Sequence, residues 1–394
     1  MKPFDLPNEP RVTELSYPTR VVLGAGALAR LPAQVARLGM KKPLIVTDAG
    51  VVKAGLLERV TAVLSAAKIA FHVFADVQQN PTDKDASEGL AAYRAGGCDG
   101  VIGVGGGSPL DAAKLVQLLT THPLPLSRYD DAKGGDQFVN DDLPPSIAIP
   151  TTAGTGSEVG RSGVVTLADT GRKTVIFSPH LLPDAAIIDP ELTVGLPPAI
   201  TAATGMDAFT HCLEAYISNG FNPLSDAVAI DGLRRVTRSL PVAFANGADV
   251  DARLDVMIGA MEGAMAFQKG LGAAHALAHA LTPLTGLHHG LSNAIVLPTV
   301  LEFNRAVVTS RLAHVAVAMG ESSVTREEVL AGNAIERVRK LNQTLKIPSR
   351  LRDVGVKEES LGKIADHAFE DSSHLGNPRK CTRDDLLSLL KTAF

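Results

Sequence analysis

The chain has 394 residues, more than a single hydrophobic core usually organises, so we expect two domains. Its composition, 45% hydrophobic and 20% charged with 36 glycines, is typical of a glycine-rich α/β enzyme rather than of a disordered or fibrous chain. The 38 lysines and arginines nearly balance the 42 aspartates and glutamates, for a net charge of -4. This balance gives no electrostatic footprint for nucleic acid or for an anionic membrane surface.

The cysteines and the amino-terminal residues indicate a compartment. Cys98, Cys212 and Cys381 are far apart and odd in number, which argues against a disulfide framework and against a CxxC zinc site. Residues 1–10 lack the apolar run of a signal peptide, and no apolar stretch reaches membrane-spanning length. We therefore expect a cytoplasmic protein.

From about residue 20 to residue 190, short β-branched runs alternate with alanine-rich helical stretches, a pattern that predicts a parallel sheet flanked by helices. Candidate strands cover Arg20–Leu23, Pro43–Thr47, Ala70–Phe74, Gly100–Val104 and Ser146–Ile149. Helical spacing marks residues 54–67 and 86–95, while the polar stretch 130–142 is expected to form an exposed loop or hairpin. After residue 195 the pattern changes to long amphipathic segments. The sequence therefore predicts an α/β domain over residues 1–195 and an all-helical domain over residues 196–394.

Residues 98–114 indicate a buried strand that breaks at Gly105–Gly107 and turns directly into a helix. Glycines let the backbone approach a ligand because no Cβ intervenes. We expect Ser108 to cap the helix, Pro109 to take its first position and Asp111 to complete a capping box. Free N–H groups and the positive end of the helix dipole would suit a pyrophosphate, and a glycine turn without a ligand is the alternative.

Two further segments could contact a dinucleotide. Gly24–Ala29 matches the fingerprint GxGxxA, but it precedes the first long strand–helix unit, so we favour a structural turn there. Asp48, at a strand end, could face an adenosine ribose and so favour NAD over NADP, or it could simply cap a helix. The hydroxyl-rich segment 149–158 could bond diphosphate oxygens or the nicotinamide amide, or be a plain connector.

Five of the 11 histidines fall into three short segments. Two pairs, Asp207 with His211 and His275 with His279, have the four-residue spacing that places side chains on one helix face. Buried imidazoles would each need a hydrogen-bond partner, whereas a divalent metal could take their lone pairs. The candidate ligands are Asp207, His211, His275 and His289. This set contains no thiolate and suits Fe(II), Zn(II), Mn(II), Co(II) or Ni(II), which as Lewis acids polarise an alcohol or carbonyl oxygen.

The motifs GGGSPLDAAK, PTTAGTGSE, GMDAFTHCLEAY, GLGAAHALAHAL and HHGLSNAIVLP, in this order, resemble those of the iron-containing (group III) alcohol dehydrogenases over nearly the whole chain. The resemblance implies a dinucleotide-binding α/β domain and a helical metal domain, with the active site in the cleft between them. It also implies that the four candidate ligands hold the metal, with His289 rather than His288 as the last of them. His279 would lie beside the nicotinamide and act as a proton shuttle, or it would be a packing histidine.

The resemblance further implies a set of cofactor-binding residues. Gly106, Gly107 and Ser108 would hold the pyrophosphate, and Thr151, Thr152 and Thr155 would line the cofactor cleft. Lys173 would reach a ribose hydroxyl, and Asp48 and Asn80 would serve the adenosine and ribose side. Gly160 departs from the family pattern and removes a cofactor hydroxyl. Lys269, in another divergent stretch, could meet an acidic substrate or be solvated.

These observations predict a metal-dependent dehydrogenase that transfers a hydride between NAD and a small alcohol, diol or hydroxy acid, with the metal polarising the substrate oxygen. NADP is less expected than NAD, and Fe(II) is the expected metal, with Zn(II) as an alternative. We expect a homo-oligomer with a small alcohol or aldehyde as substrate, and neither nucleic acid nor membrane as a partner. The alternatives are an NAD- and metal-using lyase with the dehydroquinate-synthase-like fold, a maleylacetate-type reductase, and a catalytically silent protein.

Overall fold

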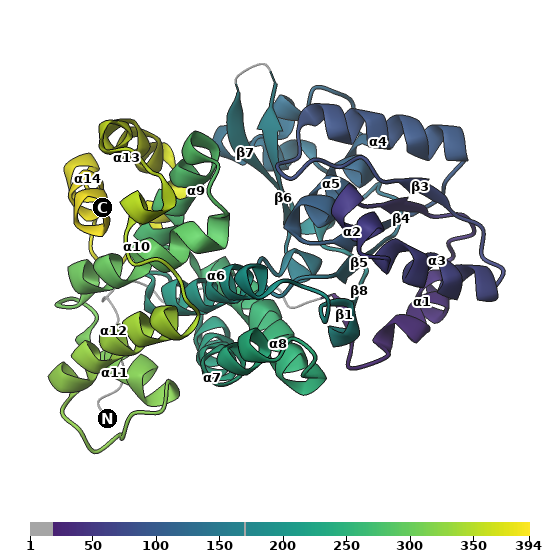
Figure 1. Ribbon diagram of the computed structural model, residues 1–394. Coiled ribbons are helices and arrows are strands. Elements are labelled where there is room, and N and C mark those ends of the chain that lie inside the picture. Colours follow the sequence, from purple (N-terminus) through teal and green to yellow (C-terminus); the bar gives the residue numbers. More distant parts are fainter. Residues whose placement is uncertain (1–18, 169–170) are drawn as a thin grey trace. The chain divides into compact units, whose positions relative to one another are not determined.

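The computed structural model describes residues 19–168 and 171–394 (Figure 1). Residues 1–18, on which the expected absence of a signal peptide partly rests, lie outside the described residues. The described chain divides between Gly195 and Leu196 into two compact units. Each unit is considered by itself below.

The first unit is built on a six-stranded sheet in the order β1-β8-β5-β4-β2-β3, in which every pairing is parallel. Its strands are β1 (Arg20–Leu23), β2 (Leu44–Val46), β3 (His72–Phe74), β4 (Val101–Gly105), β5 (Ser146–Pro150) and β8 (Ala185–Ile188). The helices are α1 (Leu31–Arg37), α2 (Ala49–Lys53), α3 (Leu56–Ala66), α4 (Asp83–Gly96) and α5 (Gly107–Leu119). The predicted parallel sheet flanked by helices is confirmed.

Alternating side chains of the central strands enter two different cores, as the pleat of a strand requires. Ile45 and Ile102 pack with residues of α1 and α3 on one face of the sheet. Their neighbours Leu44, Val46 and Val101 pack with residues of α5 on the other face. Because both faces are covered, these strands appear in the sequence as continuous apolar runs.

The structure contains two elements of this unit that the sequence did not predict. An antiparallel hairpin of β6 (Ser162–Leu167) and β7 (Arg172–Phe177) was not predicted, and neither was β8. Of the two forms expected for the stretch 130–142, the largely exposed loop is the one present: it contains two short 3-10 turns, η3 (Asp131–Lys133) and η4 (Gly135–Phe138). Asp130, at its start, is buried, and its carboxylate accepts a hydrogen bond from the Thr174 hydroxyl of β7.

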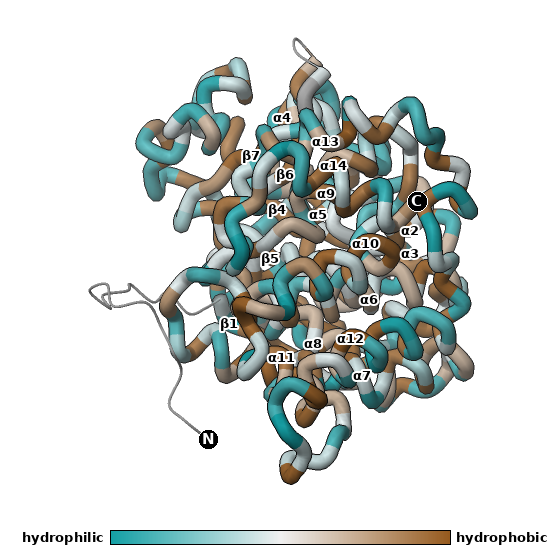
Figure 2. The backbone as a smooth tube through the Cα atoms, turned by 90° about the vertical axis from the view of Figure 1, so that its left-hand side faces the viewer, coloured by the Kyte–Doolittle hydropathy of each residue, from teal (hydrophilic) through white to brown (hydrophobic). Residues whose placement is uncertain are grey.

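Residues 196–394, all of which the structure describes, form helices and contain no strand. The helices are α6 (Pro198–Ile217), α7 (Pro223–Ala245), α8 (Val250–Ala266), α9 (Ala273–Thr285), α10 (His289–Asn304), α11 (Thr309–Ala318), α12 (Glu327–Thr344), α13 (Leu361–Glu370) and α14 (Arg383–Ala393). Figure 2 shows hydrophilic and hydrophobic residues alternating along α7 and α12, as expected of helices with one buried face. The predicted all-helical carboxy-terminal part is therefore confirmed.

The centre of this unit is α6, which is buried along nearly its whole length and packs against α7, α8 and α10. A helix that is buried on all sides can hold polar side chains only where they find partners. The polar residues of α6 are therefore the natural place to look for a site.

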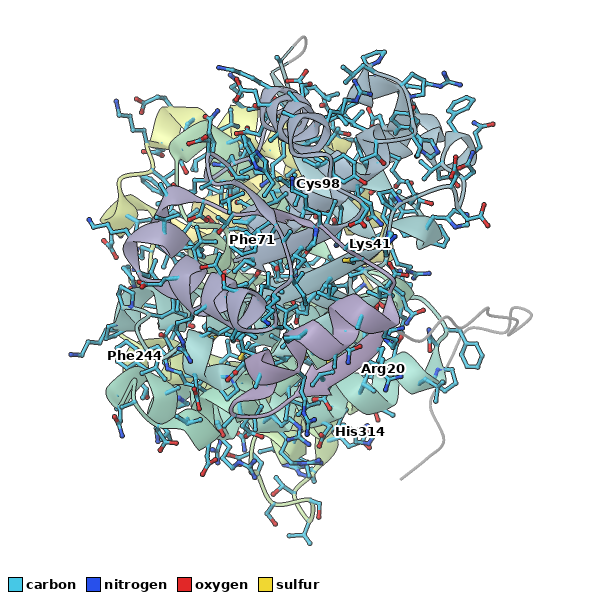
Figure 3. All side chains as sticks on the ribbon, turned by 90° about the vertical axis from the view of Figure 1, so that its right-hand side faces the viewer. Arg20, Lys41, Phe71, Cys98, Phe244 and His314 are labelled. Carbon is cyan, nitrogen blue, oxygen red and sulfur yellow. The ribbon has the colours of Figure 1, made fainter. Side chains whose placement is uncertain are left out.

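Cys98 of the first unit, labelled in Figure 3, and Cys212 and Cys381 of the second are all free thiols, as expected of a chain without a disulfide framework. Among the described helices, none combines the length and apolar character that a bilayer crossing requires.

Candidate metal and cofactor sites

Three helices of the second unit bring the predicted metal ligands together. Asp207 and His211 lie one turn apart on α6, and His275 lies in the first turn of α9. His289 is the first residue of α10, directly after His288, which stands at its N-cap position. Asp207, His211 and His275 are buried, and His289 is half-buried.

Asp207, His275 and His289 each offer a ligand atom, and these atoms lie within 4.8 Å of one another. The Asp207 Oδ1 atom is 3.4 Å from Nε2 of His289 and 3.9 Å from Nε2 of His275. The side-chain amide of Asn293 donates to the same Asp207 oxygen at 2.9 Å. We name Asp207, His275, His289 and the adjoining His211 the histidine cluster.

His211 adjoins this group but lies outside the 4.8 Å set. Its ring stacks on that of His275 with centroids 4.5 Å apart and an interplanar angle of 19°. Burial lowers the pKa of His211 to about 4, so its imidazole is neutral at pH 7. Its role as fourth ligand stays a prediction.

The donors present fit a divalent cation. Nε2 of His275 and Nδ1 of His211 are buried and have no hydrogen-bond partner within residues 19–168 and 171–394. Burial alone would raise the pKa of Asp207, but His211, His289 and His275 together hold it well below its usual range. A carboxylate beside buried imidazole nitrogens that have no hydrogen-bond partner suits a metal of intermediate hardness.

The structure adds Glu214 to the cluster, a residue that the sequence analysis missed. Its Oε2 atom lies 2.7 Å from Nδ1 of His275, and both side chains are almost fully buried. Where Nδ1 donates to this carboxylate, a neutral imidazole keeps its lone pair on Nε2. Glu214 lies on α6 seven residues after Asp207, a helical spacing that could have drawn attention to it.

His279 has a carboxylate partner of its own, also missed from the sequence. Its Nδ1 atom lies 2.9 Å from Oδ2 of Asp371, and both side chains are partly exposed. Burial would raise the pKa of Asp371, but His279 and the N–H of Ser373 hold it well below its usual range. The His279 ring stacks on that of His289 at 5.0 Å, so the predicted proton shuttle lies at the edge of the histidine cluster.

In the first unit, the two predicted cofactor loops leave the carboxyl ends of neighbouring central strands. The glycine turn Gly105–Gly107 follows β4, the hydroxyl-rich loop 151–158 follows β5, and Gly105 pairs with Pro150 in the sheet. In open parallel sheets, ligands bind at the carboxyl ends of the strands. A methyl group at Gly107 would lie 2.8 Å from Cγ2 of Thr155, so this glycine permits the close approach.

The predicted capping of α5 is wrong. The helix begins at Gly107 with Gly106 as its N-cap, because Gly105 has a φ of 149° that only glycine adopts readily and the turn is completed early. The Ser108 hydroxyl instead donates to the Gln79 carbonyl, and the Asp111 carboxylate accepts from the Ser157 hydroxyl at 2.7 Å.

Lys114 fixes the hydroxyl-rich loop to α5. Its buried ammonium donates to the Ser157 hydroxyl and to the Ser162 carbonyl, both at 2.9 Å. Burial lowers the pKa of Lys114 to about 8 and raises that of its neighbour Glu158 to about 7. Gly160 lies beside Lys114, since a Cβ there would be 3.6 Å from the Lys114 Nζ atom.

The remaining predicted cofactor residues lie in varied surroundings. Asp48 caps α2 by accepting from the Val51 N–H at 2.8 Å. Thr151 is buried, Thr152 and Lys173 are half-buried, and Asn80 is exposed. The roles of these residues in cofactor binding stay predictions.

Gly24–Ala29 forms the structural turn that was favoured. Gly24 and Gly26 have positive φ values, and the N–H groups of Gly26 and Leu28 donate to the Asp189 carboxylate at 3.2 and 2.9 Å. A carboxylate of the same chain therefore lies where a phosphate would bind.

Lys269 is neither solvated nor directed at a substrate, so both expectations for it are wrong. Its ammonium is fully buried and contacts the Asp226 carboxylate at 2.5 Å and the Tyr216 carbonyl at 2.8 Å. The two hydrogen bonds connect the turn that follows α8, residues 267–269, to Tyr216 of α6 and Asp226 of α7.

Both halves of the chain match models of one family. Residues 18–190 match the iron-containing alcohol dehydrogenase model, and residues 201–394 match the C-terminal model of the Fe-containing alcohol dehydrogenase family. The chain belongs to the iron-containing alcohol dehydrogenase family. The resemblance inferred from the motifs is thereby confirmed.

Individual members of the iron-containing alcohol dehydrogenase family are similar along their whole length. A 4-hydroxybutyrate dehydrogenase from Cupriavidus necator is 41% identical over 387 residues, covering 96% of this chain and 99% of the relative. The crystal structure of a 1,3-propanediol oxidoreductase gives a TM-score of 0.94 at 38% identity, covering 98% of this chain and all of the other. A sulfoacetaldehyde reductase from Bifidobacterium kashiwanohense, solved with NAD+, gives 0.87 at 26% identity, covering 97% and 98%. These similarities support an oxidoreductase of the alcohol dehydrogenase type.

Proposed function

We propose that this chain is an NAD- and metal-dependent alcohol dehydrogenase that oxidises a small alcohol, diol or hydroxy acid, or reduces the matching aldehyde. The convergence of Asp207, His275 and His289 within 4.8 Å carries the proposal. The similarity to a 4-hydroxybutyrate dehydrogenase and to a 1,3-propanediol oxidoreductase supports a short substrate with a second polar group.

Asp207, His275 and His289 would hold the divalent cation, with His211 as the fourth ligand. A cation of this kind supplies Lewis acidity that lowers the pKa of an alcohol. Glu214 keeps the proton of His275 on Nδ1. His279, with Nδ1 fixed by Asp371, presents Nε2 as a group that can take up or release the hydroxyl proton.

The first unit would hold NAD, which accepts the hydride. The glycine turn and the amino end of α5 would bind the pyrophosphate through backbone N–H groups. Thr152 and Thr155 adjoin this turn, since methyl groups at Gly106 and Gly107 would approach their side chains. Lys114 would hold the loop that carries both threonines.

The test is the absorbance of reduced nicotinamide after the purified chain is loaded anaerobically with Fe(II) and given NAD or NADP. The substrates are short alcohols, diols and hydroxy acids, including 4-hydroxybutyrate and 1,3-propanediol. We expect metal-dependent reduction of NAD that His275→Ala abolishes and that a control, His367→Ala at an exposed histidine of α13, leaves intact. Cofactor that is bound but never accumulates in reduced form would instead favour the lyase, which regenerates NAD in each turnover.

A further inference from the structure

The amino end of α9, which carries His275, is capped from outside the helix. The first N–H groups of an α-helix have no partner within it, and the N-cap residue usually supplies an acceptor. Here the N-cap residue is Gly272, which has no side chain. The acceptors therefore come from elsewhere in the fold.

Glu214 of α6 supplies most of them. Its Oε2 atom accepts from the N–H of Gly272 at 3.0 Å and from that of His275 at 3.2 Å. Its Oε1 atom accepts from the N–H of Ala274 at 2.7 Å. The N–H left between them, that of Ala273, donates to Oδ1 of Asn377 at 3.2 Å. All four N–H groups at this helix end are thus satisfied by two buried side chains.

The same carboxylate also holds the His275 ring, with Nδ1 2.7 Å from Oε2. One buried group therefore fixes the backbone of the first turn of α9 and the orientation and protonated nitrogen of the imidazole. In a neutral imidazole whose Nδ1 donates to this carboxylate, Nε2 keeps its lone pair, and this atom faces Asp207 at 3.9 Å.

Gly272 makes this arrangement sterically feasible. A Cβ at this position would lie 2.7 Å from Oε1 of Glu214 and 3.0 Å from Oδ1 of Asn377. Any other residue would push both acceptors away from the helix end. A residue at position 272 with a capping side chain would therefore displace Glu214 from the amino end of α9.

We propose that Glu214 is a positioning residue that couples the cap of α9 to the tautomer of His275 and thereby sets the affinity of the cluster for a divalent metal. The inference rests on the proposed function in one respect, that His275 is a metal ligand. Partners that orient a ligating histidine typically change metal affinity by about 10- to 100-fold when they are replaced.

The discriminating variant is Glu214→Gln. A glutamine has nearly the same shape and retains one oxygen, but its NH2 group cannot accept, so it cannot satisfy the three N–H groups and Nδ1 together. An NH2 group facing the ring would donate to Nδ1 and move the imidazole proton to Nε2. The matched control is Asn377→Ala, which removes the acceptor of Ala273 without touching the imidazole.

Two readouts separate this role from a structural one. Nitrogen-15 NMR of the histidine-labelled, metal-free protein reports the tautomer of His275, assigned with His275→Ala. Competition with a chromogenic chelator gives the dissociation constant for Zn(II). We expect the Nδ1-protonated form in the wild type, its loss in Glu214→Gln with Zn(II) affinity about 10- to 100-fold weaker, and no change of tautomer in Asn377→Ala.

Unchanged tautomer and unchanged Zn(II) affinity in Glu214→Gln would overturn the inference, as would a wild type protonated on Nε2 or one that binds no Zn(II). Equal losses of affinity in Glu214→Gln and Asn377→Ala would also overturn it, because the cap alone would then be responsible. Zn(II) binding that depends on Glu214 in a protein that never reduces NAD would refute the proposed function and leave the inference intact.

Discussion

The histidine cluster and the glycine turn are built in opposite ways. In the cluster, function would reside in side-chain atoms that three helices bring together, and one of them, His275, is held by the Glu214 carboxylate. The adjoining His279 is held in the same way by Asp371. In the turn, function would reside in backbone N–H groups and depends on atoms that are missing, above all the Cβ of Gly107. The cluster is therefore destroyed by removing atoms and the turn by adding them.

The largest effect is expected for Asp207→Ala. It removes the carboxylate that lies against the cluster imidazoles, so the metal should be lost and kcat/KM should fall by on the order of 10³-fold, about 4 kcal/mol. Mass spectrometry measures the metal content, and the rate of NAD reduction gives kcat/KM. Asp251→Ala, at an exposed position of α8, is the control and should behave as wild type. Full metal content in Asp207→Ala would show that the site lies elsewhere.

The next largest effect is expected for Gly107→Ala, which adds one carbon to the turn. Its methyl group would lie 2.8 Å from Cγ2 of Thr155, so the turn or the loop must shift, and the affinity for NADH should fall roughly tenfold, about 1.4 kcal/mol. Calorimetric titration with NADH measures this, and metal content should not change.

A second substitution sharpens this test. Thr155→Ser removes the Cγ2 atom that the new methyl group meets, so the double variant should recover most of the lost affinity. A double variant as weak as Gly107→Ala alone would contradict the steric explanation.

A smaller effect is expected for Asp371→Asn. The amide can still accept a hydrogen bond from His279 but binds it more weakly than a carboxylate does, so the ring is less firmly held. We expect kcat to fall about tenfold with unchanged metal content, because His279 is not a predicted ligand. Asp384→Asn, at an exposed aspartate of α14, serves as the control. Loss of metal in Asp371→Asn would place His279 among the ligands.

The smallest effect on overall turnover is expected at Asp48. Asp48→Gly should raise the use of NADP, because the charge that would repel a 2′-phosphate is gone. Asp48→Ser is the sharper variant, because serine keeps the cap of α2 at Val51 while removing the charge. We expect its preference to move toward NADP by roughly tenfold in steady-state kinetics. Unchanged preference in both variants would remove Asp48 from the cofactor site.

The sequence was most informative where neighbouring residues decide the structure. The apolar runs of β2, β4 and β5 predicted buried parallel strands, and four-residue spacings predicted shared helix faces in α6 and α9. The predicted cap of α5 was wrong although residues 108–111 match a capping pattern. The positive φ of Gly105 completes the turn early, so the helix begins before Ser108.

Partners distant in the sequence could not be predicted. Glu214 and His275 are 61 residues apart, and His279 and Asp371 are 92 apart. Lys269 finds its buried acceptor in Asp226, 43 residues away, and a single sequence gives no sign of that contact. Local patterns thus predicted the helices and the candidate ligands, whereas the groups that orient those ligands depend on tertiary packing.

The Asp189 carboxylate at Gly26 and Leu28 also bears on how fingerprints are interpreted. Because it belongs to the same fold, this carboxylate is an intramolecular competitor for the N–H groups that a phosphate would need. The N–H groups of this turn are therefore already bonded within the chain, even though its glycine spacing matches that of a phosphate-binding site. An acid that lies 163 residues away in the sequence determines whether such a turn is available to a nucleotide.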